Sequence, residues 1–305
     1  MRRSERVQQF HDKVRSGHAL IGAGAGTGLS AKCAELAGVD FIVIYNAGRF
    51  RMAGRGSMAG MMPYGNANDI VVEMAAEVLP VVAHTPVLAG VCATDPFKNI
   101  PLFLRQLTEL GFAGVQNFPS VCLLDGSARA DLEATGYGFD KEVDMVRIAH
   151  GMGLLTATYV RTEDEARAMA AVGADIVVAH VGLTAAGLIG ARDALSLDMA
   201  AERTAAIHDA ATSVRDDVLV VCHGGPIATP QDAQDVLRLV PGAAGFLGAS
   251  SMERIPAERA LIETMRRFTE VTIGHGTHVD ASLGGHGTHA DPVLDGHAEQ
   301  TGAVA

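Results

Sequence analysis

Two histidines in this sequence each end a short run of apolar residues. His180 follows IVVA, and His223 follows LVVC. Such runs are typical of strands that are buried on both faces of a parallel sheet. Because imidazole titrates near neutral pH, a histidine at the end of such a strand is suited to move a proton in a reaction. Both are candidate acid/base residues, and the alternative is a pair of hydrogen-bonded structural histidines.

Small and polar residues follow two apolar runs in the last third of the chain. The segment HGGP contains Gly224 and Gly225, and GFLGASS contains Gly248, Ser250 and Ser251. In a (β/α)8 barrel, glycine-rich turns after the seventh and eighth strands often hold a phosphate or carboxylate group. The two segments are therefore predicted to form a cradle for an anion.

The ends of the other apolar runs supply further candidate contacts to a substrate. These are Gly24, Gly26, Asn46, Arg49, Asn117 and Tyr159. Asn117 could act in catalysis by donating a hydrogen bond to an enolate oxygen, or it could simply pin a loop. Arg49 shares a long Gly- and Met-rich segment, residues 47–68, with Arg51 and Arg55. One of these guanidinium groups is expected to bind an anion, and the sequence does not decide which.

Two acidic residues in a second long segment, residues 120–138, are candidate metal ligands. Asp125 and Glu133 would bind Mg²⁺ if they folded inward, because Mg²⁺ prefers carboxylate oxygens. Solvated loop carboxylates are the alternative. Mg²⁺ is the one cofactor that these residues suggest.

Other chemistries fit the sequence poorly. None of the four lysines ends an apolar run, which argues against a Schiff-base mechanism. The segment GAGAGTG, residues 22–28, resembles a dinucleotide-binding turn, but no acidic residue ends the next strand about 20 residues later. Cys222 and His223 are adjacent in one strand, so they face opposite sides and do not form a Cys–His pair.

Eight apolar runs, each followed by a helix-like segment, must position these residues. The expected strands lie at 19–26, 41–46, 86–94, 114–119, 154–160, 175–182, 218–226 and 245–250, and an amphipathic helix at 4–16 precedes them. Regular alternation predicts a parallel sheet. Eight units favour a single closed (β/α)8 TIM barrel over a doubly wound sheet, which usually has about five or six strands. The barrel is predicted to span residues 1–270.

The remaining residues, 271–305, have a different composition. They contain no Lys or Arg and many Gly, and GHGTHVDASL at 274–283 is nearly repeated as GHGTHADPVL at 285–294. The expected structure is a flexible Gly/His-rich tail without a core. Metal binding by His275, His278, His286 and His289 is the alternative.

Composition limits the partners and the compartment. The 305 residues carry a net charge of -11 without a Lys/Arg cluster, which argues against nucleic-acid binding. No apolar run reaches the length of a membrane span, and the first residues do not form a signal peptide. The four widely spaced cysteines suit a reducing compartment. A cytoplasmic protein without a membrane partner is expected.

Several long motifs together resemble the phosphoenolpyruvate hydrolase-like family of TIM barrels, which also forms the C-terminal domain of certain plant virus-resistance proteins. The motifs run through residues 18–270 and include IVIYNAGRFRMAGRGSMAGMMPYGNAN, GFAGVQNFPSVCLLDG, ADIVVAHVGLT, HGGPIATPQDAQ and GFLGASSMER. The resemblance implies a barrel of the phosphoenolpyruvate/pyruvate superfamily, assembled as a homo-oligomer (a dimer or higher). It also implies action on small α-keto acids or phosphonates, with Mg²⁺ stabilising an enolate.

These observations favour an enzyme, a hydrolase or lyase, that cleaves a C–C, C–P or C–O bond in a small anionic keto-acid-like metabolite. His180 or His223 would move the proton, and the cradle of Gly224, Gly225, Ser250 and Ser251 would hold the anionic group. Two alternatives stay open. One is a barrel that senses a metabolite or nucleotide without turnover, and the other is a subunit that works with a partner protein.

Overall fold

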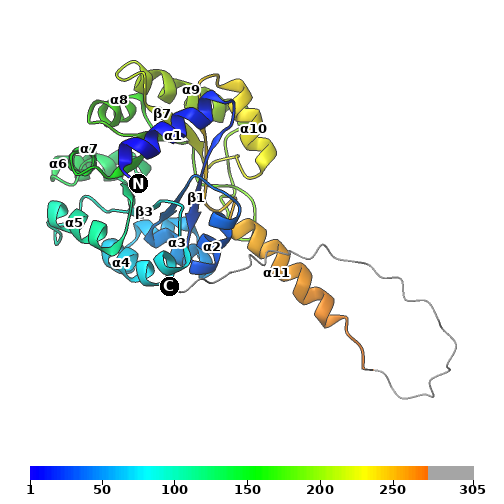
Figure 1. The fold of residues 1–305 in the computed structure, drawn as a ribbon. Coiled ribbons are helices and arrows are strands. Elements are labelled where there is room, and N and C mark those ends of the chain that lie inside the picture. The colour runs from blue at the N-terminus through cyan, green and yellow to red at the C-terminus, as the bar shows by residue number, and fades with distance from the viewer. Residues whose placement is uncertain (274–305) are drawn as a thin grey trace, which may run out of the picture. The chain divides into compact units, whose positions relative to one another are not determined.

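A closed barrel of eight parallel strands forms the centre of the computed structural model, which describes residues 1–273 (Figure 1). The strands pair in chain order, and β1 closes the barrel against β8. They are β1 (Leu20–Ala25), β2 (Phe41–Ile44), β3 (Val87–Gly90), β4 (Gly114–Gln116), β5 (Leu155–Val160), β6 (Ile176–His180), β7 (Leu219–His223) and β8 (Gly245–Gly248). The predicted (β/α)8 barrel is confirmed.

Helices surround the barrel and connect its strands. The α-helices are α1 (Arg3–Arg15), α2 (Gly28–Leu36), α3 (Asn46–Met52), α4 (Ala67–Val78), α5 (Ile100–Leu110), α6 (Gly126–Ala134), α7 (Phe139–Gly151), α8 (Glu163–Ala171), α9 (Leu197–Thr212), α10 (Pro230–Leu239) and α11 (Arg254–Thr269), and the 3₁₀ helices are η1 (Ser57–Met61), η2 (Leu79–Val81) and η3 (Val121–Leu123). The two segments expected as long loops therefore contain α3 with η1 and η3 with α6. This extra structure lies after β2 and after β4.

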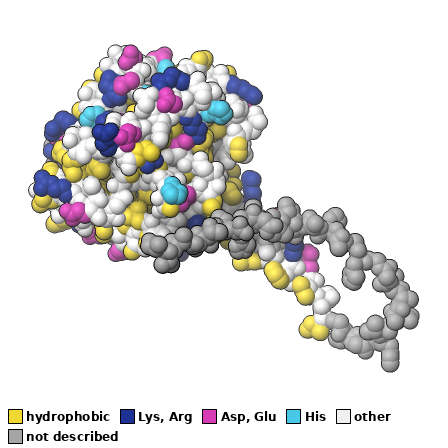
Figure 2. Space-filling model, in the orientation of Figure 1, with side chains coloured by type: hydrophobic (Ala, Val, Ile, Leu, Met, Phe, Trp, Pro, Cys, Tyr) yellow, Lys and Arg dark blue, Asp and Glu magenta, His cyan; other side chains and the backbone are white. Residues whose placement is uncertain are grey.

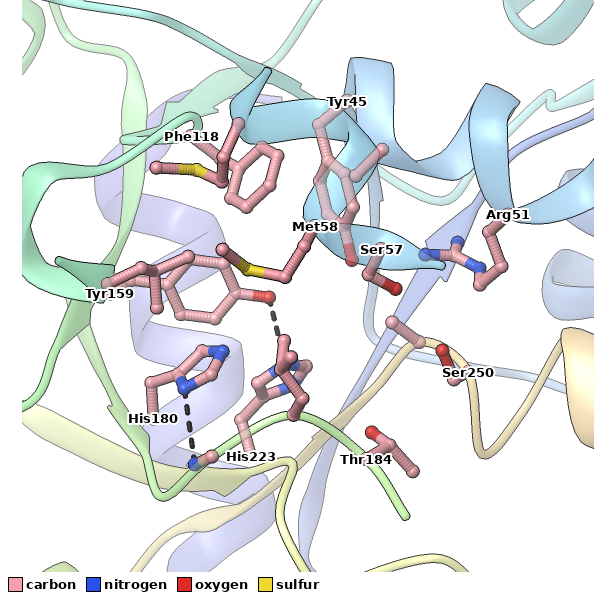
Figure 3. Close-up of a pocket in the computed structure, with 16 residues that line it drawn as sticks. Tyr45, Arg51, Ser57, Met58, Phe118, Tyr159, His180, Thr184, His223 and Ser250 are labelled. Carbon is pink, nitrogen blue, oxygen red and sulfur yellow. Dashed lines mark hydrogen bonds between the residues drawn. The ribbon is translucent and has the colours of Figure 1, made fainter. Parts of the chain in front are cut away.

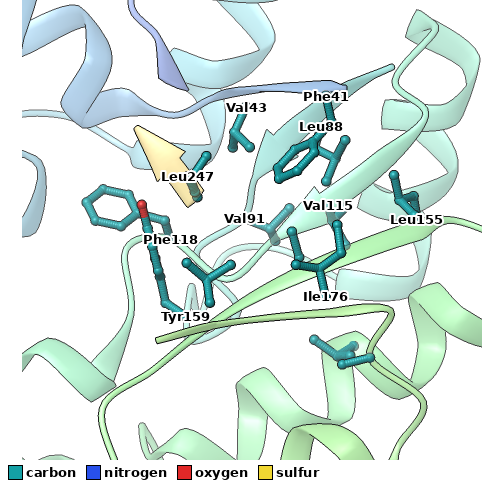
Figure 4. Packing of buried hydrophobic residues seen from close by; sticks show 14 of the residues in the cluster. Phe41, Val43, Leu88, Val91, Val115, Phe118, Leu155, Tyr159, Ile176 and Leu247 are labelled. Carbon is teal, nitrogen blue, oxygen red and sulfur yellow. The ribbon is translucent and has the colours of Figure 1, made fainter. Parts of the chain in front are cut away.

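Complete burial explains why the strands read as continuous apolar runs. Every residue of β2, β6 and β7 is buried, because helices cover the outside of the sheet and side chains fill the inside. Residues alternate between these two sides along each strand. Figure 4 shows part of the buried packing. Gly22 pairs with Phe41 and Leu247, and a Cβ atom there would lie 2.3 Å from the Phe41 ring, so glycine leaves room for that ring.

The predicted N-terminal helix, α1, packs across the amino ends of the strands. The Phe10 and Phe41 rings lie 6.3 Å apart. Arg3 forms an ion pair with the buried Asp175, which directly precedes β6. Lys13 pairs at 2.6 Å with Asp40, which directly precedes β2. The helix thus closes the end of the barrel that lies opposite the carboxyl ends of the strands.

Residues 1–264 form one compact unit, and α11 continues past its end. Residues 274–305, which include the four candidate metal-binding histidines of the predicted tail, lie outside the described residues, so the structure of the tail stays a prediction. Among residues 1–273, no helix is long and apolar enough to cross a membrane. On the face shown in Figure 2, acidic and basic side chains are interspersed. The homo-oligomer stays a prediction.

Replacing Asp175 with Asn should destabilise the protein by about 2–3 kcal/mol, because a buried, charge-assisted set of hydrogen bonds is lost. The Asp175 carboxylate accepts from Arg3 and from both the backbone and the hydroxyl of Thr156. Urea unfolding would measure the change. Asp144→Asn, which breaks an exposed pair with Arg147, is the control, and we expect it to cost less than ~1 kcal/mol. Equal effects of the two changes would contradict the structural role of the buried pair.

Candidate functional site

A small cavity opens at the carboxyl ends of the barrel strands (Figure 3). Its volume is about 30 Å³. The lining residues come from most of the strand ends and from the segments that follow them: Tyr45, Ala47, Arg51, Ser57, Met58, Met61, Phe118, Leu123, Tyr159, His180, Gly182, Leu183, Thr184, His223, Ala249 and Ser250. In barrels of this kind, the carboxyl ends of the strands are where ligands bind.

Side-chain alternation decides which strand-end residue reaches the cavity. Tyr45 and Phe118 line it, with ring centroids 4.8 Å apart. Asn46 and Asn117, each adjacent in sequence to one of them, are buried and are not among the lining residues. Neighbouring residues in an extended strand point to opposite sides, so a tyrosine and a phenylalanine replace the two predicted asparagines at the cavity.

Tyr159, His180 and His223 form a cluster whose ring centroids lie 4.9 to 5.1 Å apart. The Nδ1 atom of His223 lies 2.7 Å from the Leu247 carbonyl oxygen. Because a carbonyl only accepts, Nδ1 carries the proton, and Nε2 accepts from the Tyr159 hydroxyl at 3.2 Å. In His180, Nδ1 accepts from the Gly182 amide at 3.3 Å. Neutral His180 therefore carries its proton on Nε2.

Burial keeps all three groups uncharged near neutral pH. It lowers the pKa of His223 to about 4. It also lowers the pKa of His180 well below its ordinary value, and the neighbouring His223 adds to this shift. Burial raises the pKa of Tyr159 well above its ordinary value, since each charged form would lose its hydration. The cluster consequently offers neutral hydrogen-bond donors and one proton acceptor, His223 Nε2.

A buried ion pair borders the cavity on the side of β1 and β8. Arg51 lines the cavity, and its Nε donates to Glu253 Oε2 at 2.8 Å. The other carboxylate oxygen of Glu253 accepts from the Gly26 amide at 2.6 Å and from the Ser30 hydroxyl. The Arg51 guanidinium also lies 5.7 Å from the centroid of the Tyr45 ring. One carboxylate thus fixes the end of β1, the start of α2 and the cation of α3.

Asn117 positions Tyr159 from the far side of the sheet. Its Oδ1 accepts from the Tyr159 amide at 2.7 Å, and its Nδ2 donates to the Tyr159 carbonyl at 3.0 Å and to Glu142 at 2.6 Å. Glu142, fully buried on α7, also accepts from the Ser120 hydroxyl and the Val121 amide. Burial raises the pKa of Glu142 to about 7. These contacts favour the loop-pinning interpretation of Asn117 over the catalytic one.

The other predicted asparagine, Asn46, holds η1 in place. Its Nδ2 donates to the Gly60 carbonyl at 2.8 Å, and its Oδ1 accepts from the Ala47 amide at 2.9 Å. Ala47, Met58 and Met61 line the cavity. Asn46 therefore acts on the cavity wall through the segment that it ties down.

The two predicted glycines in and directly after β1 make room for the site. A Cβ atom on Gly24 would lie 2.8 Å from the Tyr45 hydroxyl oxygen, and one on Gly26 would lie 2.2 Å from the Gly48 carbonyl oxygen. Contacts this short require displacement of a neighbour. The two glycines thus admit Tyr45 and α3 close to the barrel.

Only part of the predicted anion cradle lines the cavity. Ser250 does, whereas Gly224, Gly225, Gly248 and Ser251 do not. Gly224 and Gly225 have positive φ angles of 80° and 57°, and the Gly225 amide donates to the Gly182 carbonyl at 2.7 Å. Their turn is therefore shaped by the neighbouring loop after β6.

Among the three candidate arginines, Arg51 is the one at the cavity. Arg49 instead forms an ion pair with Glu73, in which both side chains are at least one-third exposed. Tyr45, Phe118 and Glu253 were missed by sequence reasoning. Strict alternation along the apolar runs would have found Tyr45, because Phe41, Val43 and Tyr45 share one side of their strand. The same alternation applies to Phe118, which follows β4.

The side chains at the cavity do not fit a Mg²⁺ ion. Within the part of the chain that the structure describes, no carboxylate lines the cavity, and the oxygens of the adjacent Glu253 are engaged by Arg51, Gly26 and Ser30. The candidates Asp125 and Glu133 do not line it either, and Glu133 pairs with Arg129 at 2.7 Å. Among residues 1–273, no cluster of three or more His, Cys, Asp or Glu side chains could hold a metal. Mg²⁺ needs carboxylate oxygens that are free to coordinate it.

Solved structures with the same architecture define the class of fold. One is 2,3-dimethylmalate lyase, a PEP mutase/isocitrate lyase superfamily member, at 14% identity and a TM-score of 0.52 over 91% of this chain and 92% of that chain. Another is phosphonopyruvate hydrolase in complex with oxalate and Mg²⁺, at 16% identity and a TM-score of 0.51 over 88% of each chain. The chain thus has a TIM-barrel fold like that of the PEP mutase/isocitrate lyase superfamily.

The family follows from the sequence. The model of the family described as phosphoenolpyruvate hydrolase-like matches residues 5–271, and the chain belongs to this family. The ToMV resistance protein Tm-1(GCR237) of Solanum lycopersicum is 54% identical over 267 residues, which are 88% of this chain and 35% of the relative. The chain therefore spans about a third of that relative's length. The resemblance read from the motifs is confirmed.

Glu142 should make stability fall as pH rises from about 4.5 to about 7. In this range the unfolded chain, with a pKa near 4.5, releases a proton that the folded protein, with a pKa of about 7, retains. The stability of the wild type relative to Glu142→Gln should therefore decrease by roughly 2.5 kcal/mol between pH 5 and pH 8. Urea unfolding at several pH values measures this difference, with the exposed change Glu109→Gln as the control. A difference that does not vary with pH would refute the protonated state of Glu142.

Proposed function

We propose that this protein is an enzyme that breaks a C–C, C–P or C–O bond in a small anionic, keto-acid-like compound. The observation that carries this proposal is the neutral Tyr159–His223 pair at the strand ends. Support also comes from the family to which the chain belongs and from the lyase and hydrolase that share its fold. The cavity would hold the reacting end of the substrate.

Directed hydrogen bonds, rather than net charge, would bind the anionic group. The charge of Arg51 is balanced by Glu253 at 2.5 Å, so the ion pair contributes little net field to the cavity. The guanidinium still presents N–H donors in a fixed plane that suits a carboxylate. Ser57, Thr184 and Ser250 add hydroxyl groups around the same space.

The hydrogen bond from Tyr159 to His223 defines a route for a proton. When a substrate hydroxyl gives its proton to the Tyr159 oxygen, the Tyr159 proton passes to His223 Nε2 at 3.2 Å. The electrons of the substrate O–H bond then form a carbonyl, and the adjacent C–C bond breaks toward an enolate. The Nδ1 atom of His180 accepts from the Gly182 amide, so the proton of this ring is on Nε2. This N–H group would donate to the enolate oxygen. His223 returns its proton through Tyr159 to the enolate carbon.

A second candidate function is ligand sensing without turnover. The favouring observations are the absence of a free carboxylate along the cavity in the described residues and the name of the tomato relative, which concerns virus resistance. A sensor would gain stability from a ligand, by about 2.7 kcal/mol at a hundredfold excess over Kd. It would release no product on long incubation.

Tyr159→Phe should lower kcat by about 10²- to 10⁴-fold while KM changes little, because the proton route is cut and the ring remains. The test begins with a screen of 2-keto acids, 2-hydroxy diacids, phosphoenolpyruvate and phosphonopyruvate for turnover by NMR. The variant is then assayed on the best substrate. The matched control is Tyr64→Phe, at an exposed tyrosine outside the cavity. Full activity of Tyr159→Phe would remove Tyr159 from the mechanism, and ligand-induced stabilisation without any product would favour the sensor.

The activity should not fall between pH 7 and pH 5. The acceptor His223 has a pKa of about 4, so it stays unprotonated over this range and becomes protonated only as the pH falls toward 4. The profile of kcat/KM against pH measures this in the free enzyme. A tenfold loss centred near pH 6.5, where an ordinary histidine titrates, would contradict the assignment.

A further inference from the structure

A second cleft lies beside the barrel-centre cavity. Its volume is about 430 Å³, which is within the usual size of small-molecule sites. It is bounded by η1 and the segment after it, by the segment between β3 and α5, and by the segment from the end of β4 to α6. The lining residues are Asn46, Gly60, Met61, Met62, Pro63, Gly65, Asn66, Ala67, Cys92, Thr94, Asp95, Pro96, Phe97, Pro119, Ser120, Val121, Leu124, Leu132 and Tyr137.

One side chain, Met61, borders both the cleft and the cavity. It belongs to η1, which Asn46 holds through the Gly60 carbonyl. Methionine has three rotatable side-chain bonds and adapts to different neighbours. Met61 is therefore an adaptable part of the wall that the two spaces share.

The wall of the cleft is mostly apolar. Among the described residues, neither Lys nor Arg lines it, and Asp95 is the one charged group there. The Asp95 carboxylate accepts from Asn66 at 2.7 Å, from Asn68 at 3.0 Å and from the Phe97 amide at 2.9 Å, so its oxygens are already engaged. Phe97 stands at the cleft with 88% of its surface exposed. These walls suit a hydrocarbon group and disfavour an anion.

The sizes of the two spaces are complementary. The cavity, at about 30 Å³, has room for about one water molecule, so a bound keto acid would extend beyond it. The cleft is the adjoining space, and Met61 borders both. An elongated ligand would place its acid group near Arg51 and its hydrocarbon group between Thr94 and Leu132.

We infer that the substrate of this barrel is a keto-acid-like anion that carries an apolar substituent, such as an aryl or branched alkyl group, and that the cleft holds this substituent. The inference rests on the proposed function, since it takes the barrel-centre cavity as the site of the acid group. The inference adds a class of substrate, namely keto-acid-like anions with an apolar substituent, which the small central cavity alone does not define.

Isothermal titration with pyruvate and phenylpyruvate tests the inference, because the two probes share a keto acid and differ by a phenyl group. Burial of the ring should make the Kd of phenylpyruvate at least tenfold lower. Thr94→Trp, which fills the cleft, should bring the ratio of the two Kd values close to one. Leu132→Trp, on the opposite wall, serves as a second filling variant if the first fails to fold. Ser127→Trp, at an exposed position of α6 outside both spaces, should keep the wild-type ratio.

Each outcome decides between the claims. Equal Kd values for the wild type, or an unchanged ratio in both folded filling variants, would overturn the role of the cleft and leave the proposed function standing. If neither acid binds the wild type, the keto-acid function itself fails, and the inference fails with it. A tenfold preference that is lost in a filling variant and kept in Ser127→Trp supports the inference.

Discussion

In a closed parallel barrel, every second residue of each strand must face the interior, and this constraint governs the whole site. The register of β6 and β7 pairs His180 with His223. The two imidazoles therefore lie at the same level along the barrel axis. The same alternation turns Tyr159 toward them. A shift of one residue in any of these strands would exchange a cavity residue for one that faces the helices. The cluster of Tyr159, His180 and His223 is therefore a consequence of strand register.

Buried polar groups then lock what the register provides. Glu253 ties Arg51 to the end of β1, and Asn117 ties the end of β4 to Tyr159. Both acidic side chains at these positions, Glu253 and Glu142, are buried and hydrogen-bonded. Desolvation is costly for such groups unless their partners are in place. This cost keeps the donors around the cavity in fixed positions, which favours catalysis by pre-organised groups.

The sequence predicted the barrel well because eight apolar runs alternate regularly with helix-like segments. It also located His180, His223, Tyr159 and Ser250, which all end or follow such strands. It also named Asn46 and Asn117, which do not line the cavity, although Asn46 lines the adjoining cleft. It could not select Arg51 over Arg49, because that choice depends on the fold of α3. Nor could it reveal Glu253 as the partner of Arg51, since 202 residues separate them.

The central claim is that His223 is neutral, carries its proton on Nδ1 and accepts from Tyr159. Nitrogen-15 NMR of histidine-labelled protein reports the charge and tautomer of each imidazole, and comparison with His223→Gln assigns the signals. The structure predicts that the two His223 signals indicate a neutral ring with a protonated Nδ1 throughout pH 5.5 to 8. A His223 ring that titrates near pH 6.5, or that carries its proton on Nε2, would contradict the proton route proposed for this site.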